Sequence, residues 1–305
     1  MTALSAYRPV ALAGGFAFPE APRWHAGRLW ISDVYGYSVF SIGLDGSVQK
    51  VVEVPGRPSG LGWLPNGDLL IVSMKDRRIL RFDGSRLAEH ADLSKMAEWH
   101  LNDMVVDDFG RAYVGNLGVD HTKNESIAAA SLIRVDPDGS SRAVARNLLG
   151  PNGSVITPDG RCLLVAESLG GRILAFDIAG DGALSNRRCW FSAGNPPLRS
   201  ATYREALANG ELTWVPDGMA LDAENAAWVA DAAGQKFERI LNGQVVEIMD
   251  LSALNLMAIA CALGGEDGRT LFLCVGPSFQ EDECVACPRA QILAVRVQSP
   301  HAGRP

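Results

Sequence analysis

The sequence predicts an all-β protein, a six-bladed β-propeller, from two observations. The first is a hairpin pattern, clearest at 150–166, where an apolar strand, a Pro158-Asp159-Gly160 turn and a second apolar strand follow one another. Proline pre-sets such a turn and glycine accepts its positive φ. The second is that the pattern occurs six times at a spacing that is mostly about 40–50 residues, the period of a propeller blade. Six blades of this kind close into a ring with protected edges.

The turns align the six repeats on one position, the residue that opens the first strand of each. In four repeats this residue stands eight positions before the turn residue, and these four are Ser59, Asn102, Asn152 and Asp217. Glu20 stands seven positions before its turn and Ala258 ten positions before, in a shorter and a looser copy. We therefore expect one propeller domain over 1–305, with blades that begin near residues 18, 57, 101, 151, 216 and 257.

Further short apolar segments, bounded by turn residues, supply the remaining strands of each repeat. They lie at 27–33 and 39–42, 69–72 and 78–82, 112–115 and 131–135, 162–166 and 171–177, 226–231 and 237–240, and 270–275 and 291–295. Because a radial fold must close its ring, we expect the apolar segment at 7–14 to join the last blade. The tail at 298–305 is expected to be disordered.

Three segments interrupt the period and are expected to form loops at strand ends, where binding loops usually lie. They are 118–130, 193–214 with one helical turn at 204–208, and 276–288. His121 lies on the first and is a candidate to reach the channel. Four large side chains on or near the loops either line an apolar pocket or serve as packing: Trp99, Trp214, Met257 and Phe279.

Composition limits the classes of partner and compartment. No apolar run reaches membrane-spanning length, and a formal net charge of −7 at pH 7 argues against a nucleic-acid surface. Residues 1–10 lack the regions of a signal peptide, and the six cysteines have no dense spacing, so a reduced, cytoplasmic protein is expected. Cys284 and Cys287 form one Cys-x-x-Cys pair without a second, which favours an incidental loop pair. Nothing in the sequence specifies an oligomeric state.

The aligned positions carry the chemistry. First strands line the central channel of a propeller, so equivalent positions converge on one axis. The set Glu20, Ser59, Asn102, Asn152, Asp217 and Ala258 brings two carboxylates and two carboxamides to one level. Two buried like charges require a positive group between them. Hard oxygen ligands suit Ca²⁺, Mg²⁺ or Mn²⁺, so Glu20, Asn152, Asp217 and Asn102 are the predicted ligands of one divalent cation.

The same stretches resemble the senescence-marker-protein-30/gluconolactonase family, which includes regucalcin-like and luciferin-regenerating-enzyme-like proteins. The resemblance spans about 15–297, and its motifs lie at 18–24, 102–107, 151–153, 185–188, 216–222 and 264–265. It implies a six-bladed propeller that uses a divalent cation to hydrolyse lactones, with Ca²⁺ expected first and Zn²⁺ as a further alternative. It also implies that Glu20, Asn152 and Asp217 bind the metal and that Asn102 contacts the substrate.

One departure from the family concerns the substrate. Sugar-lactone members carry Arg two residues before the substrate-contacting Asn, whereas this chain has His100. Arginine offers a rigid fork of donors to substrate hydroxyls, while histidine gives one donor and one acceptor. His100 should lie on the same side as Asn102, because strand positions two apart share a face. Asp120 falls near an acidic substrate contact of some relatives. A substrate less sugar-like than gluconolactone follows.

These residues predict a metal-dependent hydrolase of a cyclic ester. The cation would polarise the carbonyl, and Asp217 or Glu20 would position or deprotonate the attacking water. One alternative is a metal-dependent hydrolase of other esters. Another, from a different class, is a non-catalytic propeller that binds a ligand or partner around a structural cation. A serine nucleophile is poorly supported, since no Gly-x-Ser-x-Gly stands between a strand and a helix.

Overall fold

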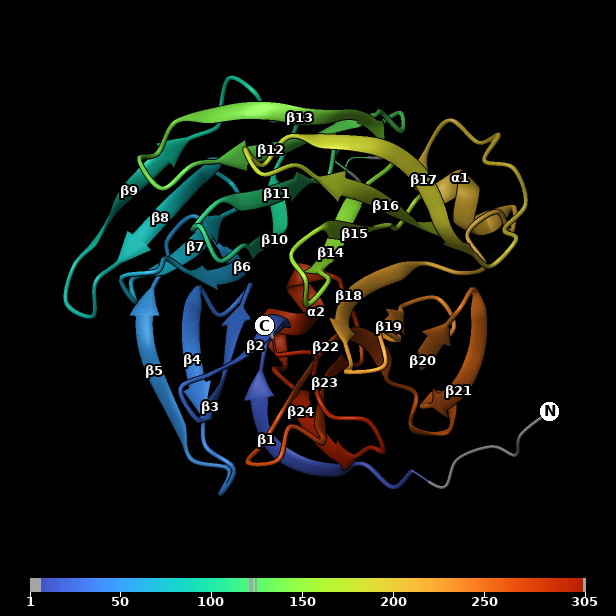
Figure 1. Ribbon diagram of the computed structural model, residues 1–305. Helices are drawn as coiled ribbons and strands as arrows, with labels where there is room; N and C mark the ends of the chain where they lie inside the picture. The colour runs from blue at the N-terminus through green and yellow to red at the C-terminus, as the bar shows by residue number, and fades with distance from the viewer. Residues whose placement is uncertain (1–6, 121–122, 124, 304–305) are drawn as a thin grey trace. The chain divides into compact units, whose positions relative to one another are not determined.

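The computed structural model describes residues 7–120, 123 and 125–303. Within these residues the strands form six four-stranded sheets, the blades of a six-bladed β-propeller (Figure 1). The predicted fold class is confirmed. The described chain also contains two short α-helices and the 3₁₀ turn η2 (Ser252–Leu254). None of its helices is long and apolar enough to cross a membrane.

Each blade takes four strands. Blade 1 contains β2 (Pro19–His25), β3 (Arg28–Asp33), β4 (Ser38–Ile42) and β5 (Val48–Glu53). Blade 2 contains β6 (Pro58–Trp63), β7 (Leu69–Ser73), β8 (Arg78–Phe82) and β9 (Leu87–Asp92). Blade 3 contains β10 (Leu101–Val106), β11 (Ala112–Asn116), β12 (Ala130–Val135) and β13 (Ser141–Leu148).

The second half of the chain follows the same plan. Blade 4 contains β14 (Pro151–Ile156), β15 (Cys162–Glu167), β16 (Arg172–Ile178) and β17 (Leu184–Ser192). Blade 5 contains β18 (Pro216–Leu221), β19 (Ala227–Asp231), β20 (Lys236–Leu241) and β21 (Gln244–Asp250). Blade 6 contains β22 (Met257–Gly264), β23 (Thr270–Gly276), β24 (Ala290–Arg296) and the N-terminal strand β1 (Val10–Phe16).

The turn residues that align the six repeats have the backbone that the alignment requires. All six have a positive φ, which glycine and asparagine adopt at low cost. The values are 76° at Gly27, 91° at Gly67, 80° at Gly110, 71° at Gly160, 61° at Asn225 and 72° at Gly268. One local signal therefore sets the register between the first and second strands of every blade.

The chain divides into two compact units. The first unit comprises 1–58 and 217–305, and the second comprises 59–216. In the first unit β22 packs against β18, so closely that a Cβ on Gly218 would lie 2.3 Å from the Cβ of Ala260. In the second unit β10 packs against β6, where a Cβ on Gly60 would lie 2.4 Å from the Met104 nitrogen. First strands of neighbouring blades are thus direct neighbours within each unit.

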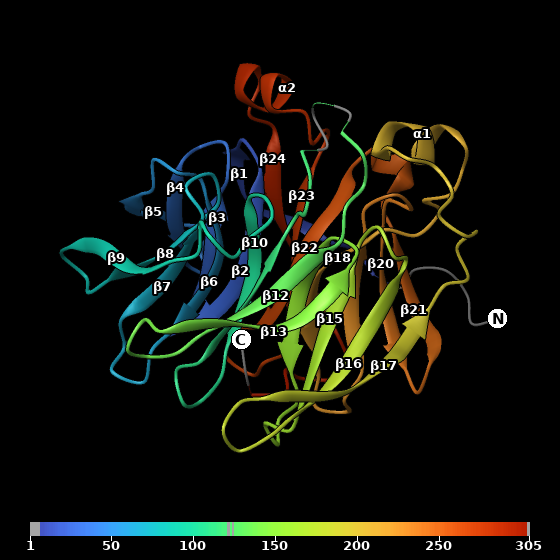
Figure 2. The same cartoon turned by 90° about the horizontal axis from the view of Figure 1, so that it is seen from above.

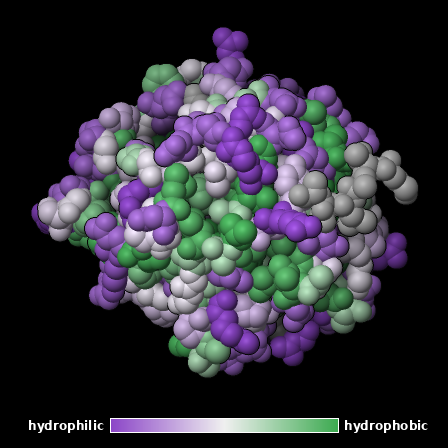
Figure 3. Space-filling view, turned by 90° about the horizontal axis from the view of Figure 1, so that it is seen from below, coloured by the Kyte–Doolittle hydropathy of each residue, from purple (hydrophilic) through white to green (hydrophobic). Residues whose placement is uncertain are grey.

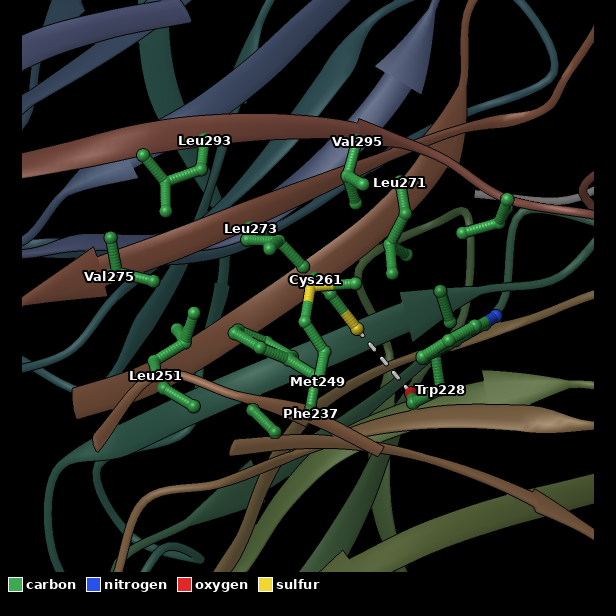
Figure 4. Packing of buried hydrophobic residues seen from close by; sticks show 14 of the residues in the cluster. Trp228, Phe237, Met249, Leu251, Cys261, Leu271, Leu273, Val275, Leu293 and Val295 are labelled. Atoms are coloured by element: carbon green, nitrogen blue, oxygen red, sulfur yellow. Dashed lines mark hydrogen bonds between the residues drawn. The ribbon is translucent and has the colours of Figure 1, made fainter. Parts of the chain in front are cut away.

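The core of the first unit includes an apolar cluster between blades 5 and 6. Trp228, Phe237 and Met249 from blade 5 meet Leu271 and Leu273 from blade 6, all at most 1% exposed (Figure 4). The Cys261 thiol donates a hydrogen bond to the Trp228 carbonyl at 3.4 Å within this cluster. Burial of such side chains contributes about 1.5–3 kcal/mol each, which is why the alternating apolar residues of these strands face inward.

The first and last described segments belong to the first unit. β1 pairs with β24 in antiparallel register from Val10–Ala294 to Phe16–Ala290. The described part of the tail departs from the expectation of disorder at 298–305. The Ala223 amide donates to the Pro300 carbonyl at 2.8 Å, and the Ala302 amide donates to the Leu221 carbonyl at 3.1 Å. These backbone hydrogen bonds hold the tail in place. The tail lacks the alternating apolar residues from which a strand is predicted, so this pairing could not be predicted from the sequence.

Two of the three predicted loops pack against each other in the second unit. Ser126 forms an isolated bridge with Thr202, and the Ile127 amide donates to the Ala201 carbonyl at 2.7 Å. The predicted helical turn at 204–208 is confirmed as α1 (Tyr203–Ala208), which begins with a Thr202–Glu205 capping box. Trp214 is 3% exposed and packs edge-on against Phe191, so it serves as packing rather than as a pocket wall.

The third predicted loop, 276–288, contains α2 (Glu281–Ala286), which stands beyond the ends of β23 and β24 (Figure 2). Cys284 is the buried residue of this helix. Phe279 is 42% exposed and Val285 53% exposed. Other large exposed apolar side chains are spread over many elements, and one face of the molecule shows apolar side chains (green) among polar ones (purple) (Figure 3).

Candidate functional site

The six aligned positions occupy one structural position. Each is the second residue of the first strand of its blade: Glu20 in β2, Ser59 in β6, Asn102 in β10, Asn152 in β14, Asp217 in β18 and Ala258 in β22. Four of these strands show a register shift at or just after this residue, those of Glu20, Asn102, Asn152 and Ala258. Such bulges re-aim side chains at functional sites.

The first unit contains both predicted carboxylate ligands. Glu20 is 7% exposed and Asp217 is 9% exposed, and their strands β2 and β18 each pack against β22. Burial raises the pKa of the Cys274 thiol, the negative charges of Glu20 and Asp217 raise it further, and Arg23 opposes them. The two carboxylates therefore lie within electrostatic range of the same buried group. Two buried carboxylates near each other favour a cation between them.

A local device orients Glu20. Its Oε2 accepts a hydrogen bond from the Ala21 amide at 2.9 Å, and Ala21 has a φ of 47°. A left-handed φ on alanine is strained, and such strain is found where a side chain must be aimed. The register shift of β2 against β3 falls between Glu20 and Arg23, which gives the same local bend.

The second unit contains both predicted carboxamide ligands. The Asn102 Nδ2 approaches the Pro151 carbonyl at 3.5 Å, so Asn102 lies beside the residue that precedes Asn152. The Asn152 Nδ2 donates to the Ser168 Oγ at 3.2 Å, and Ser168 donates in turn to the Pro216 carbonyl at 2.7 Å. Pro216 is the residue before Asp217 in the chain.

The oxygen of Asn152 is the atom that best fits a cation. It is buried and has no hydrogen-bond partner among the described residues. Buried polar atoms nearly always have a partner, so such an atom requires an explanation. The Ser168 contact holds the amide by its nitrogen and leaves its oxygen available, as a ligand of Ca²⁺ or Mg²⁺ requires.

Ser59 and Ala258 complete the set without adding a charge, and both are at most 1% exposed. Groups of three or more His, Cys, Asp or Glu that could hold a metal ion do not occur in the part of the chain that the structure describes. The predicted ligand set is not such a group, because it contains only two carboxylates and its other two members are asparagine carboxamides.

Two of the three predicted substrate contacts, His100 and Asp120, belong to one side-chain cluster in the second unit. The His100 ring stacks on Trp99 with centroids 4.5 Å apart and planes 15° apart. The Lys123 ammonium lies 5.6 Å from the Trp99 ring centroid and pairs with Asp120 Oδ2 at 3.2 Å. Asp120 is 7% exposed, and its amide donates to Glu125 Oε2 at 3.3 Å. His100 and Asp120 are thus joined through Trp99 and Lys123.

Sequence reasoning missed Ser168 and Lys123. Ser168 follows the last residue of β15, and Pro151 pairs with Glu167, so the hairpin register alone could have placed Ser168 near Asn152. Lys123 lies on a loop without periodicity, and no sequence signal points to it. His121, the candidate from the same loop, falls outside the described residues. Cys284 is buried and Cys287 exposed, and both are free thiols.

Comparison with known proteins decides the family. Residues 18–276 match the family described as the SMP-30/Gluconolactonase/LRE-like region. The chain belongs to this family. Of its relatives, a Bacillus subtilis (strain 168) protein, YvrE, which is named as a sugar lactone lactonase, is 23% identical over 293 residues, or 93% of this chain and 88% of that protein. Regucalcin from Danio rerio is 27% identical over 186 residues, or 60% of this chain and 56% of regucalcin.

Solved structures of family proteins share the fold. A gluconolactonase from Xanthomonas campestris is 23% identical with a TM-score of 0.72, covering 97% of this chain and 91% of that one. A calcium-binding protein from Agrobacterium tumefaciens, regucalcin, is 17% identical with a TM-score of 0.75, covering 97% and 95%. A luciferin-regenerating enzyme is 17% identical with a TM-score of 0.75, covering 96% and 97%. At these identities the likeness concerns the fold alone.

Proposed function

We propose that this protein is a metal-dependent hydrolase that opens a lactone ring by adding water. The buried, unpartnered Oδ1 of Asn152 is the observation that carries the proposal, because it lies at the strand position that Glu20, Asn102 and Asp217 share. Family membership supports the reaction class, since relatives are named as a sugar lactone lactonase and a gluconolactonase. Six free cysteines support the further proposal of a cytoplasmic location.

Glu20, Asn152, Asp217 and Asn102 would hold the cation, since equivalent positions of the blades surround the axis of a propeller. An all-oxygen set with two charges suits Ca²⁺, and Mg²⁺, Mn²⁺ and Zn²⁺ are the alternatives. A relative described as a calcium-binding protein supports the choice of Ca²⁺. When bound, the cation supplies Lewis acidity toward a substrate carbonyl.

The protein's own groups manage the water and the proton. Asp217 or Glu20 accepts a proton from the attacking water, whose oxygen then bonds to the carbonyl carbon of the lactone. The ring C–O bond breaks, and the leaving alkoxide takes up the proton, which yields the open hydroxy acid. The Asn102 amide and His100 donate hydrogen bonds to substrate oxygens, and Asp120 accepts from a substrate hydroxyl.

His100 makes the substrate less sugar-like than gluconolactone. The imidazole offers one donor where an arginine would offer a fork of five N–H groups, so it can hydrogen-bond to fewer substrate hydroxyls. Its ring lies flat on Trp99, which presents apolar surface next to it. A lactone with fewer hydroxyls and a larger apolar part fits the Trp99–His100 surface better.

His100→Ala is expected to lower activity on the best substrate at least tenfold, about 1.4 kcal/mol of transition-state binding, with bound metal unchanged. His100→Arg is expected to shift preference toward hydroxylated lactones. Steady-state kinetics on paired lactones with and without hydroxyls measure both effects. His90, a half-buried histidine in β9, provides the matched control, and His90→Ala should leave activity unchanged. If the His100→Ala variant has the same kinetics as the wild type, His100 serves only as a packing residue.

A pH-stat assay tests the proposed function. A panel of aldonolactones and apolar lactones is assayed with the protein as purified, after EDTA treatment and after Ca²⁺ is restored. We expect turnover of at least one lactone, its loss with EDTA and its return with Ca²⁺. Turnover that is unchanged by EDTA would contradict the proposed metal dependence. Absence of turnover across the whole panel would favour a non-catalytic ligand-binding propeller.

A further inference from the structure

The loop at 276–288 is held to blade 1 at a few points. The Tyr35 hydroxyl donates a hydrogen bond to the Phe279 carbonyl at 3.0 Å. The Arg57 guanidinium pairs with the Glu281 carboxylate at the start of α2. Both contacts lie within the first unit and join residues more than two hundred positions apart. The loop therefore depends for its position on Tyr35 of blade 1 and on Arg57, which lies in the connection between β5 and β6.

A cavity borders the loop. Its volume is about 170 Å³, and it is lined by Pro277, Ser278 and Cys284 of the loop and by Ala17 and Asn255. Cys284 is the buried residue of α2, and its thiol donates back into the loop, to the Ser278 carbonyl at 3.2 Å. A segment with few buried apolar contacts opens at low free energy, so single polar contacts decide where it stays.

The surroundings of the Arg57 side chain favour such a contact. Its guanidinium carbon lies 5.1 Å from the Tyr35 ring centroid and 5.9 Å from that of Tyr37. Its side chain is only 14% exposed, and the residue has a φ of 70°. A guanidinium stacked on two aromatic rings keeps its planar fork in one orientation, which a lysine would not. The Glu281 pair thus forms on a preorganised partner.

Tyr35 connects the loop to the predicted site. Its ring packs against Phe18 at 5.3 Å between centroids, and Phe18 stands two residues before Glu20. The Asp33 carboxylate fixes this turn by accepting hydrogen bonds from the Phe18 amide at 2.7 Å and the Gly36 amide at 3.3 Å. Burial raises the pKa of Tyr35 to about 12, and Glu20 is among the charges that act on it. The loop contact therefore lies close to Glu20.

We propose that Arg57 is a positioning residue that, through Glu281 and Tyr35, holds the 276–288 loop beside Glu20 and so limits the bulk of the lactone substituent that the site accepts. This inference rests on the proposed lactone hydrolysis. The aromatic rings of Phe18 and Tyr35 form the fixed wall, and the loop with Phe279 forms the part that Arg57 keeps in place. Release of the loop relaxes the size limit without removing a metal ligand.

Glu281→Gln and Arg57→Gln test the inference from the two ends of the pair. The readout is the ratio of kcat/KM for γ-butyrolactone and for a γ-lactone with a long alkyl chain. We expect either variant to raise the relative rate of the bulky lactone about tenfold, the lower end of what one methylene is worth in an apolar pocket. The double variant should add little, because both changes break one contact. Hydrogen exchange of the backbone amides of residues 278–287 should become faster in both variants.

The exposed Lys50–Glu53 pair of β5 provides the matched control, and Lys50→Gln should change neither the ratio nor the exchange. An unchanged ratio in both test variants, with lactone turnover intact, would overturn the inference and leave the proposed function standing. Unchanged exchange in both would overturn the role of the Arg57–Glu281 contact. Absence of lactone turnover in the wild type would overturn the proposed function, and the size limit with it.

Discussion

Asp217→Ala is expected to abolish lactone turnover and bound cation while the protein stays folded. The change removes one of two charged oxygen ligands from the proposed set, so the rate should fall at least about a hundredfold, a loss of several kcal/mol of transition-state stabilisation. The alanine side chain fits where a 9%-exposed aspartate stood, and β18 keeps its backbone pairing. Elemental analysis and pH-stat kinetics measure the two losses. Full activity with full metal content would show that the alignment of first strands is wrong.

Asp222→Ala, five residues further along the chain, is expected to act on stability instead. Asp222 is fully buried, and its Oδ2 accepts from the Arg239 Nε at 2.7 Å. Its Oδ1 accepts from the Glu224 amide at 2.9 Å and the Ala226 amide at 3.0 Å. Arg239 keeps its pairs with Glu224 and Glu247, so the loss of Asp222 should cost about 3 kcal/mol, the lower end of the range for breaking a buried ion pair. At the usual unfolding entropy per residue this corresponds to a Tm lower by roughly 5 °C.

Asp159→Ala is the matched control, because Asp159 occupies the corresponding turn of blade 4 but is exposed. It accepts from the Thr157 hydroxyl at 2.6 Å and the Arg161 amide at 3.1 Å, without a buried cation. Its loss should cost about 1 kcal/mol. Thermal unfolding followed by circular dichroism compares the three proteins. Equal Tm values for Asp222→Ala and Asp159→Ala would contradict the role given to the buried pair.

The fold was predictable because one local signal repeats. A turn residue with positive φ fixes each hairpin, and strand alternation fixes which side chains face inward. The same signal places Glu20, Asn102, Asn152 and Asp217 at the second residue of their strands, although Glu20 and Ala258 deviate from the common spacing. In these two blades the missing or extra residues lie between the strand start and the turn, so the start of the strand, and not a fixed count from the turn, identifies the position.

Contacts between segments that lie far apart in the chain could not be predicted from the sequence. Nothing in the local pattern joins Tyr35 to Phe279 or Arg57 to Glu281, because these pairs depend on how the last blade returns to the first. The tail shows the same limit, since residues 300–302 are held by backbone hydrogen bonds that any side chains would allow. Ser126 and Thr202 pair across two loops for a similar reason. Tertiary placement, rather than propensity, decides such contacts.

Calorimetric titration of Ca²⁺ into the EDTA-treated protein measures whether Asn152 and its equivalents hold a cation. We expect one Ca²⁺ per chain for the wild type and clearly weaker binding for Asn152→Leu, which keeps the volume of the side chain but removes its oxygen. Ser73→Ala, which removes a buried hydroxyl in β7, should bind as the wild type does. A wild type that binds no Ca²⁺, Mg²⁺, Mn²⁺ or Zn²⁺, or an Asn152→Leu variant that binds as tightly as the wild type, would contradict the proposed cation site.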